Sequence, residues 1–447
     1  MARKVFISFL GKSDYAECKY GSPDTEKVKY VQEATLNYLG AKEWPGNSVA
    51  YILLTKDAKN ANWKDDGHID RTTKIIKKNI GLKKRLKLMK LPFKVKVIDK
   101  LPDGNTKKEI WKIFQRVFDK IEKGDELYFD LTHGFRYLPM LILVLGNYSK
   151  FLKDVKVKSI TYGNFESRKN DVAPIIDITS LSLLQDWTYA AGTYLDSGNV
   201  KKLTEMSGER YADFADKLKE TIADFHTCRG ISIIESTNIK QIKSLMDSMD
   251  TSELPPLKYV FDEIKADFNK YDDIQNVKNG YESAKWCYKN QLYQQAITIL
   301  IETVISDICI SENLDWKRRK NREIASNALY IVANSISENG WKVVTDTDDK
   351  DKYKADYLPM LDSNPESLDV IEENVKYRKK YYTELMLYRQ LVESQRVKEL
   401  IELSSMIKDV RDDIDHAGMR DGARPYDVIE SELKNIFTKL NSIALCS

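Results

Sequence analysis

A short turn that follows an apolar run carries groups suited to binding an anion. Residues 127–131 predict a buried strand, and Pro139 suits the first turn of the helix that comes next. We expect Thr132 to cap that helix. The free N–H groups of its first turn and the positive end of its dipole would then face an anion beyond the strand. The sequence thus predicts a phosphate-binding turn over residues 132–136, which we call the ligand turn.

Side chains of the ligand turn add to this prediction. His133 and Arg136 are hydrogen-bond donors, and Gly134 permits close approach of the backbone to a ligand. The alternative interpretation is an ordinary strand-to-helix turn, in which Asp130 holds the amides of the loop. Local features do not separate the two.

An arginine and a histidine near the C-terminus, Arg411 and His416, form a second candidate site. An imidazole titrates near neutrality and can transfer protons, whereas a guanidinium keeps its charge and can stabilise negative phosphoryl oxygens. We therefore take His416 as a general acid/base, Arg411 as a phosphate clamp and Asp412 as an orienting group. In the alternative, Arg411 pairs with Asp415 at i+4 and His416 interacts favourably with the helix dipole.

The helix that must carry these residues is amphipathic. Its apolar positions alternate spacings of three and four, at Leu400, Leu403, Ile407, Val410 and Ile414. Gly418 predicts its C-terminal cap. Because positions five apart lie about 140° around a helix, Arg411 flanks the apolar stripe while His416 points largely away from it. Either the last turn is distorted, or two copies of the chain form the site about a twofold axis.

The first 180 residues alternate short strand patterns with longer helical patterns. The predicted strands are Val5–Leu10, Val49–Leu54, Phe93–Ile98, Leu127–Leu131 and Val157–Tyr162, and the predicted helices are Lys107–Ile121 and Tyr137–Leu152. This alternation predicts a parallel α/β sheet covered on both faces, whose ligands bind beyond the carboxyl ends of the strands. The residues expected there are Gly11, Thr55, Thr132, His133, Gly134, Phe135, Arg136, Tyr162 and Gly163. Since the sequence has neither Gly-x-Gly-x-x-Gly nor a Walker motif, we expect no dinucleotide or ATP site.

A dense series of basic residues lies within residues 71–100. It includes Lys77, Lys78, Lys83, Lys84, Arg85, Lys87 and Lys90. The series could attract RNA or steer a ligand, but a solvated helical face is the interpretation that we favour.

Length and composition limit the remaining possibilities. A length of 447 residues predicts two or three domains. With 71 basic and 68 acidic residues, its net charge of +3 means that any RNA contact must be local. Its five cysteines lack the paired spacing of a zinc ribbon and fit a reduced cytoplasm. We see no signal peptide and no apolar run near the roughly 20 residues of a membrane span, so we expect a cytoplasmic protein.

Two parts of the sequence resemble known domains. "DLTHGFRYLP", residues 130–139, resembles the signature of CARF domains, the Rossmann-like sensors in CRISPR-associated proteins of type III systems. Residues 4–11, 51–55 and 103–110 agree with this resemblance in order. After Leu184 strand signals almost disappear, and residues 284–302 together with the amphipathic helix before Gly418 resemble HEPN ribonuclease domains.

The resemblance implies three domains: a Rossmann-like α/β CARF domain over 1–182, an all-α connecting domain over 183–275 and an all-α HEPN domain over 276–447. It implies an endoribonuclease of type III CRISPR defence that is activated by cyclic oligoadenylate and degrades single-stranded RNA without a metal or other cofactor. The RNA 2′-OH would attack the adjacent phosphorus and leave a 2′,3′-cyclic phosphate. Cyclic tetra-adenylate is the expected activator, with cyclic hexa-adenylate next, and the expected assembly is a homodimer or a higher even oligomer.

Two other functions stay open at this point. The chain could be a non-enzymatic sensor whose helical middle binds DNA or a partner protein. Alternatively, the CARF domain could also cleave its own cyclic ligand through Thr132, His133 and Arg136. The sequence leaves open the ring size of the activator, the base preference of the nuclease and its basal activity.

Overall fold

The computed structural model forms two compact units, Met1–Asp186 and Trp187–Ser447, which we call the N-terminal unit and the helical unit. It describes residues 2–70, 72–134, 136–344, 354–356, 384–419 and 421–443. The boundary between the units falls inside α6 (Thr179–Ser197). The proposed split of the helical unit at residues 275 and 276 stays a prediction.

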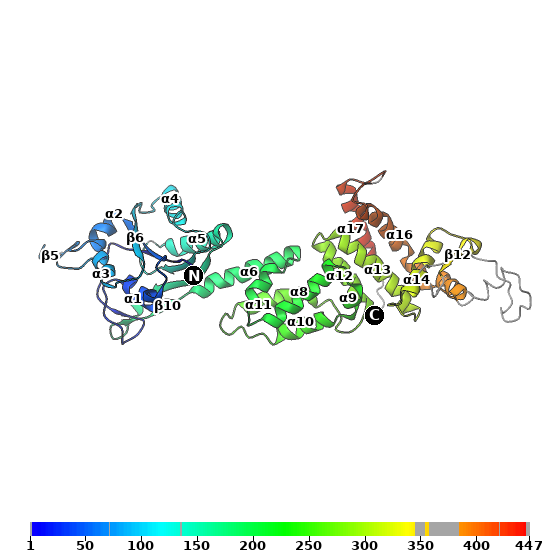
Figure 1. The fold of residues 1–447 in the computed structure, drawn as a ribbon, viewed down its shortest axis with the longest axis horizontal. Helices are drawn as coiled ribbons and strands as arrows, with labels where there is room; N and C mark the ends of the chain where they lie inside the picture. Colours follow the sequence, from blue (N-terminus) through cyan, green and yellow to red (C-terminus); the bar gives the residue numbers. More distant parts are fainter. Residues whose placement is uncertain are drawn as a thin grey trace, which may run out of the picture. The chain divides into compact units, whose positions relative to one another are not determined.

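The N-terminal unit is built on a six-stranded sheet, drawn in blue to cyan in Figure 1. Its strands, in chain order, are β1 (Lys4–Phe9), β3 (Val49–Thr55), β6 (Lys94–Leu101), β7 (Glu126–Asp130), β8 (Lys156–Gly163) and β10 (Ile175–Asp177). The first five pair in parallel, and β10 is antiparallel to β8. The five predicted strands and the parallel sheet are confirmed, whereas the three-residue β10 was not expected.

Helices cover both faces of this sheet, as its alternating burial requires. They are α1 (Val31–Tyr38), α3 (Leu82–Leu88), α4 (Lys107–Phe118) and α5 (Leu138–Lys153). In β1, Val5, Ile7 and Phe9 share a core with α4 and α5. The intervening Phe6 points to the opposite face and shares a core with α1 and α3. This alternation is the period-two geometry of a strand that is buried on both sides.

The strand order places a switch point at β1. The order in the sheet is β10-β8-β7-β1-β3-β6, so the chain builds outward from β1 through β3 and β6 and then returns to the other side of β1 with β7. In open α/β sheets, ligands bind outside the carboxyl ends of the strands at such a point. The ligand turn follows β7 directly, so it lies beside this crevice.

Short elements complete the N-terminal unit. They are β2 (Lys19–Tyr20), η1 (Ala41–Glu43), α2 (Lys56–Ala58), η2 (Lys59–Trp63), β4 (His68–Ile69), β5 (Ile76–Lys77), η3 (Phe165–Ser167) and β9 (Val172–Ala173). On α3, Lys83, Lys84 and Lys87 are exposed, while the Arg85 Nε donates to the buried Glu33 at 2.8 Å. The basic series therefore forms a solvated helical face there, as we favoured.

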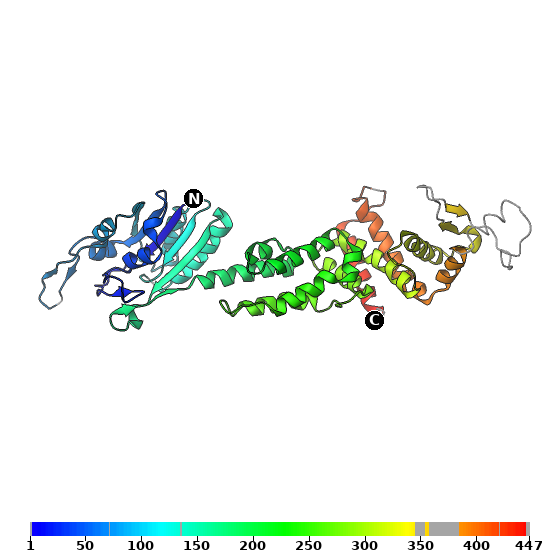
Figure 2. The ribbon, with the colours of Figure 1, turned by 60° about the horizontal axis from the view of Figure 1, so that its bottom comes forward.

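The helical unit consists almost entirely of helices in the part that the structure describes (Figure 2). They are α7 (Lys201–Ser207), α8 (Ala212–His226), α9 (Gly230–Glu235), α10 (Thr237–Asp247), α11 (Leu257–Phe268), α12 (Val277–Lys289), α13 (Tyr293–Ser311), α14 (Arg319–Ala333), η4 (Glu338–Gly340), a helix over 384–393, α16 (Gln395–Asp415) and α17 (Tyr426–Ser442). Two three-residue strands, β11 (Lys342–Val344) and β12 (Lys354–Asp356), pair with each other.

The central helix of this unit is α13, which packs against α12, α14 and α16. Among the described helices, α13 alone is long and apolar enough to cross a membrane by length and composition. Of its most apolar window, 67% is buried inside the unit. This burial accounts for the apolar composition of α13.

A buried ion pair fixes the start of α16 against α13. The Arg396 guanidinium donates to both carboxylate oxygens of Asp307, at 2.5 and 3.1 Å, and the Tyr281 hydroxyl of α12 donates to the same carboxylate at 2.6 Å. The side chains of Arg396 and Asp307 are 6% and 1% exposed. Removing one partner of such a pair costs about 3–5 kcal/mol. The pair therefore holds the first turn of α16 in place against α13.

Candidate functional site

A pocket of about 480 Å³ lies beyond the carboxyl ends of β1, β3, β6 and β7, and we call it the strand-end pocket. Of the residues predicted for this place, Gly11, Thr55, Thr132, His133 and Gly134 line it. Arg136 is exposed and, like Tyr162 and Gly163, does not line it. Phe135 lies outside the described residues.

A buried carboxylate, Asp130 at the end of β7, holds Thr132, which lines the pocket. Asp130 is 1% exposed and accepts hydrogen bonds from the Ser8 Oγ at 2.7 Å and from the Thr132 Oγ1 and N–H at 2.6 and 3.1 Å. The Thr132 Oγ1 in turn accepts from the Gly163 N–H at 2.8 Å. Gln32 donates to the Ser8 Oγ at 3.1 Å. Burial raises the pKa of Asp130, and the bonds from Thr132 and Ser8 oppose that rise.

This network corrects the expected role of Thr132. The helix α5 begins at Leu138, with Tyr137 at its N-cap position and no side-chain cap bond, so the prediction that Thr132 caps it is wrong. The buried Asp130 carboxylate takes the hydroxyl of Thr132 because an unsatisfied buried acceptor would be costly. The expected place of Pro139 in the first helical turn is confirmed. Asp130 also holds one loop amide, as the alternative interpretation required.

Two glycines allow the backbone to line the pocket closely. Gly134 has φ +137°, and a Cβ there would lie 2.2 Å from the Leu138 Cδ1. A Cβ on Gly11 would lie 2.3 Å from the Tyr15 hydroxyl oxygen. Since Cβ atoms essentially never approach so closely, neither position tolerates a side chain without movement. Backbone atoms of both loops therefore face the strand-end pocket without an intervening side chain at these two glycines.

An aromatic pair forms one wall of the pocket. The rings of His133 and Tyr15 stack with their centroids 4.1 Å apart and their planes at 16°. The His133 Nε2 is buried, and no hydrogen-bond partner for it exists among the described residues. Burial lowers the pKa of His133 to about 4. His133 is therefore a neutral imidazole near pH 7, which can donate or accept a hydrogen bond but carries no charge toward a phosphate.

A second polar cluster supports the loop that follows β1. The Asn62 Nδ2 donates to the carbonyl oxygens of Gly11 and Ser13 at 2.9 and 2.8 Å. The Asn62 Oδ1 lies 2.9 Å from the His68 Nε2. No sequence pattern pointed to Asn62 or Tyr15, because Asn62 meets Gly11 and Tyr15 meets His133 across long stretches of chain.

The end of α16 carries the other predicted site. The Arg411 Nε donates to the Asp415 Oδ2 at 3.1 Å, which is the i+4 pair of the alternative interpretation. His416 is the C-cap residue, and the Gly418 N–H closes the helix on the Asp413 carbonyl at 3.2 Å. The Gly418 cap is thus confirmed. Within the described chain no hydrogen bond joins Arg411 to His416, and both are exposed.

The carboxylates beside this pair have separate roles. Asp413 is 3% exposed and accepts from the Arg424 N–H and Nε at 3.0 and 2.9 Å, so it ties the helix end to the segment that precedes α17. No sequence pattern pointed to Arg424. Asp412, which lies between Arg411 and Asp413 in the sequence, is half-buried.

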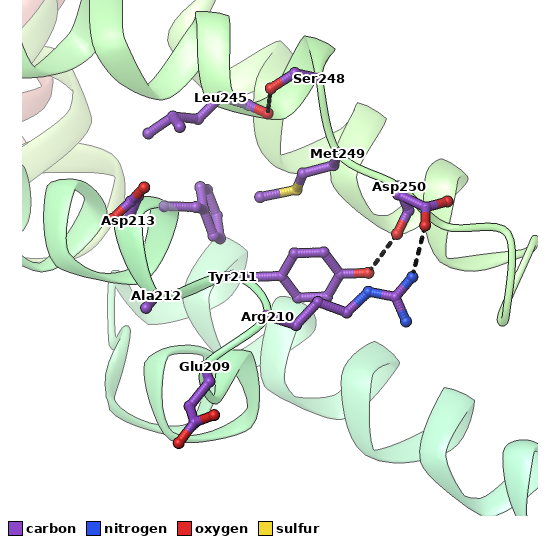
Figure 3. Close-up of a pocket in the computed structure, with 10 residues that line it drawn as sticks. Glu209, Arg210, Tyr211, Ala212, Asp213, Leu245, Ser248, Met249 and Asp250 are labelled. Atoms are coloured by element: carbon purple, nitrogen blue, oxygen red, sulfur yellow. Dashed lines mark hydrogen bonds and ion pairs between the residues drawn. The ribbon is translucent and has the colours of Figure 1, made fainter.

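Another pocket, of about 300 Å³, lies in the helical unit between residues 209–214 and 245–250 (Figure 3). Arg210 forms ion pairs with Asp250, at 2.9 Å, and with Glu253. The Tyr211 hydroxyl donates to the Asp250 carbonyl oxygen at 2.8 Å. These contacts join the loop before α8 to the loop after α10. Since carboxylates neutralise Arg210, the pocket offers little attraction to a phosphate.

We expect the pH dependence of stability to report the neutral state of His133. The folded pKa of about 4 lies below the ordinary 6.5 of the unfolded chain, so protons favour the unfolded state between these values. Relative to His133→Gln, the wild type should therefore lose stability as the pH falls from about 6.5 to about 4, and the difference should be constant above that window. Urea denaturation of both proteins at several pH values measures this. A difference that does not vary across the window would contradict a buried neutral imidazole.

One family model matches most of the N-terminal unit. Residues 5–166 match the family model described as the CARF domain of the CRISPR system endoribonuclease Csx1. Over 237 residues, 51% of this chain, the sequence is 28% identical to a CRISPR-associated protein of Methanocaldococcus jannaschii. The match spans 36% of that relative's length, about a third. A solved structure of Enterococcus italicus Csm6 bound to cyclic hexa-2′-fluoro-hexa-dAMP has a TM-score of 0.43 and 13% identity, covering 99% of this chain and 93% of that chain.

The family model spans β1 to β8 except for Lys4, the first residue of β1, and it contains the strand-end pocket and the ligand turn. The resemblance to CARF-containing proteins of type III CRISPR systems is thereby confirmed. Over residues 5–166 the N-terminal unit is a CARF domain.

Proposed function

We propose that the chain is an endoribonuclease that cyclic oligoadenylate activates. The observation that carries this proposal is the strand-end pocket of the CARF domain, which combines close backbone approach with an aromatic wall. The family whose CARF model matches is described as an endoribonuclease, which supports RNA cleavage as the output.

The pocket suits a purine nucleotide better than a bare phosphate. His133 is neutral, so its stack with Tyr15 offers a flat surface and a hydrogen-bonding ring nitrogen to a base. Stacking of a base on an aromatic side chain is worth about 1–3 kcal/mol. Phosphates can meet backbone N–H groups at Gly11 and in the ligand turn. Among cyclic oligoadenylates we propose the tetra-adenylate as activator, with the hexa-adenylate next.

The end of α16 supplies groups for metal-independent cleavage of RNA. In this chemistry the 2′-OH attacks the adjacent phosphorus, its proton goes to a base, and the 5′-oxygen leaves with a proton from an acid. His416 serves in proton transfer, and Arg411 stabilises charge on the phosphoryl oxygens. Because Arg411 holds Asp415 through Nε, its terminal NH₂ groups can still reach a phosphate. The i+4 pair thus orients the guanidinium instead of competing with its role.

The neighbouring carboxylates fit a metal-free site. Asp413 is held by Arg424 and Asp415 by Arg411, so neither is arranged with a second carboxylate as a cation ligand. We therefore propose that EDTA leaves the activity intact.

The geometry of α16 favours a site shared between two copies of the chain. The helix runs without interruption from Gln395 to Asp415 and closes through the Gly418 N–H, so the distorted last turn that could bring Arg411 and His416 together is not present in one chain. A twofold arrangement of two helix ends would bring both arginines and both histidines to one centre on the axis. The proposed enzyme is accordingly a homodimer or a higher even oligomer.

A non-enzymatic sensor is the main alternative. It would require a binding surface in the helical middle, where the pocket in Figure 3 has its arginine already paired. Cleavage of the cyclic ligand by the CARF domain itself is a further alternative. A His133 with a pKa of about 4 is poorly matched to proton transfer near neutral pH, which argues against that histidine as the acid/base.

We expect His416→Ala and Arg411→Ala each to lower ligand-stimulated RNA cleavage by at least about 100-fold, the scale of a lost acid/base group or charge clamp. Both residues are exposed, so the free energy of unfolding and the affinity for the cyclic ligand should change little. Fluorogenic RNA measures the cleavage rate, and calorimetry measures the free energy of unfolding and the affinity for the cyclic ligand. Lys408→Ala, which removes an exposed cation one turn earlier on α16, is the matched control and should keep its activity. Near-normal rates in both single variants would exclude this helix end as the nuclease site.

A mixed dimer distinguishes a shared centre from two separate ones. If both histidines converge on one centre, a heterodimer of a His416→Ala chain and a wild-type chain should lose far more than half of the activity. If each chain has its own site, about half should remain. The measurement needs two affinity tags to purify the heterodimer, and a wild-type dimer with the same two tags is its control. Half-activity would contradict the shared centre.

A further inference from the structure

Four aromatic rings form a row that leads from the core of the helical unit to its surface. Phe437 of α17 is 4% exposed and stacks on Tyr288 of α12, with the centroids 4.3 Å apart and the planes at 10°. The Tyr288 ring lies 6.0 Å from Tyr293, the first residue of α13. The Tyr293 ring lies 6.5 Å from Tyr426, the first residue of α17. Tyr426 is 63% exposed, so the core supports a ring that stays largely open to solvent.

The carboxylate of Glu430 holds the outer end of this row. The Tyr426 hydroxyl donates to the Glu430 Oε1 at 3.0 Å, and the Tyr293 hydroxyl donates to the same oxygen at a longer 3.5 Å. The Tyr293 hydroxyl and the Glu430 carboxylate raise the pKa of Tyr426, so its phenol stays uncharged. Among the described residues, no hydrogen bond reaches the Oε2 of the exposed Glu430. We call Tyr293, Tyr426 and Glu430 the tyrosine platform, which combines a fixed aromatic surface with a free acceptor oxygen.

The tyrosine platform lies beside the end of α16 that carries the proposed nuclease centre. The helix α16 packs against both α13 and α17 (Figure 1). Arg424 donates to the Asp413 carboxylate through its N–H and Nε, at 3.0 and 2.9 Å, and to Glu432 of α17 at 2.5 Å. Tyr426 follows Arg424 by two residues, which span at most about 7 Å. A neighbouring nucleotide of an RNA strand that is held at Arg411 can therefore reach Tyr426.

The groups of the platform suit a nucleobase better than a phosphate. A carboxylate repels a phosphate but accepts hydrogen bonds from the exocyclic amino group of a base. A ring that is already held in place loses little conformational freedom when a base stacks on it. Adenine, cytosine and guanine carry an exocyclic amino group, whereas uracil presents two carbonyl oxygens. Lys434, one turn beyond Glu430 on α17, is exposed and offers a cation to the phosphate of the bound nucleotide.

We propose that the tyrosine platform is a base-binding subsite of the nuclease and that it favours a base with an exocyclic amino group over uracil. The base stacks on Tyr426, and its amino group donates to the Glu430 Oε2. The platform lies apart from the groups that transfer the proton and clamp the phosphate, so it selects the RNA sequence and takes no part in breaking the bond. The inference rests on the proposed function, since the base belongs to the RNA that this centre cleaves.

RNA binding measured without cleavage tests the subsite. The probes are fluorescently labelled oligouridylates in which one central position is adenine, cytosine, guanine or uracil. The protein is the full-length His416→Ala chain with cyclic tetra-adenylate present, so that no probe is cut. In fluorescence anisotropy we expect the three amino-base probes to bind at least about tenfold more tightly than the all-uracil probe, the effect of a hydrogen bond to a charged group. Equal dissociation constants for the four probes would overturn the proposal.

Two further variants in the same background separate stacking from recognition of the amino group. Tyr426→Ala should weaken binding of all four probes by at least about tenfold, because stacking acts on every base. Glu430→Gln should lower the preference for amino bases to less than about twofold, since an amide can also donate to a uracil carbonyl. The matched control is Tyr259→Ala on α11, which removes a tyrosine that is 72% exposed and should leave all four affinities unchanged.

The outcomes for the platform and for the proposed function are distinct. Tyr426 and Glu430 are exposed, so both variants should fold, and circular dichroism checks this. Unchanged binding in the folded Tyr426→Ala variant would overturn the proposal. Base-selective binding that depends on Tyr426, in a protein whose wild type cleaves no RNA, would count against the nuclease alone. Wild-type cleavage at equal rates for the four probes would count against the platform alone.

Discussion

A buried carboxylate at the end of β7 fixes the geometry on which the ligand pocket depends. Asp130 is 1% exposed, so its oxygens must be satisfied inside the protein. It takes the hydroxyl of Ser8 from β1 and both the hydroxyl and the amide of Thr132, and Thr132 binds the Gly163 amide at the end of β8. Three adjacent strand ends are thereby joined through Asp130 and Thr132. At the start of α5, the N-cap residue Tyr137 makes no side-chain cap bond.

In the helical unit, a buried ion pair has a comparable positioning role, but it lies farther from the candidate site. The buried Arg396–Asp307 pair, with the Tyr281 hydroxyl, fixes the first turn of α16 to α12 and α13. At the other end of the helix, Asp413 is held by Arg424. Between these two anchors α16 is regular, so it presents Arg411 and His416 at its solvent-exposed end. A rigid helix that keeps these two side chains apart is the physical reason to expect a second copy in the proposed catalytic centre.

The periodic parts of both units could be predicted from the sequence. The five parallel strands, α4, α5 and the cap at Gly418 all follow from local patterns of period two or 3.6 and from glycine at a helix end. The place of the pocket followed as well, since parallel strands put their carboxyl ends on one edge. The three-residue β10 was missed because so short an edge strand carries almost no pattern.

The contacts that define the pocket could not be predicted in the same way. Thr132 was expected to cap a helix, but the demand of Asp130 for donors depends on burial by the whole sheet. Tyr15 stacks on His133 from a loop that is more than a hundred residues away in sequence, and this packing is part of what keeps the imidazole neutral. Asn62 reaches the loop after β1 from η2. Each of these depends on tertiary structure that local patterns do not contain.

The central claim is that a ligand of the CARF domain controls an RNA-cleaving centre in the helical unit. The most direct test is the rate at which the purified chain cleaves fluorogenic single-stranded RNA in EDTA, measured with cyclic tri-, tetra- and hexa-adenylate and without ligand. The account predicts strong stimulation by one ring size, first of all the tetra-adenylate, with products that end in 2′,3′-cyclic phosphate. RNA cleavage that is absent under all four conditions, or that is equally fast without ligand, would contradict it.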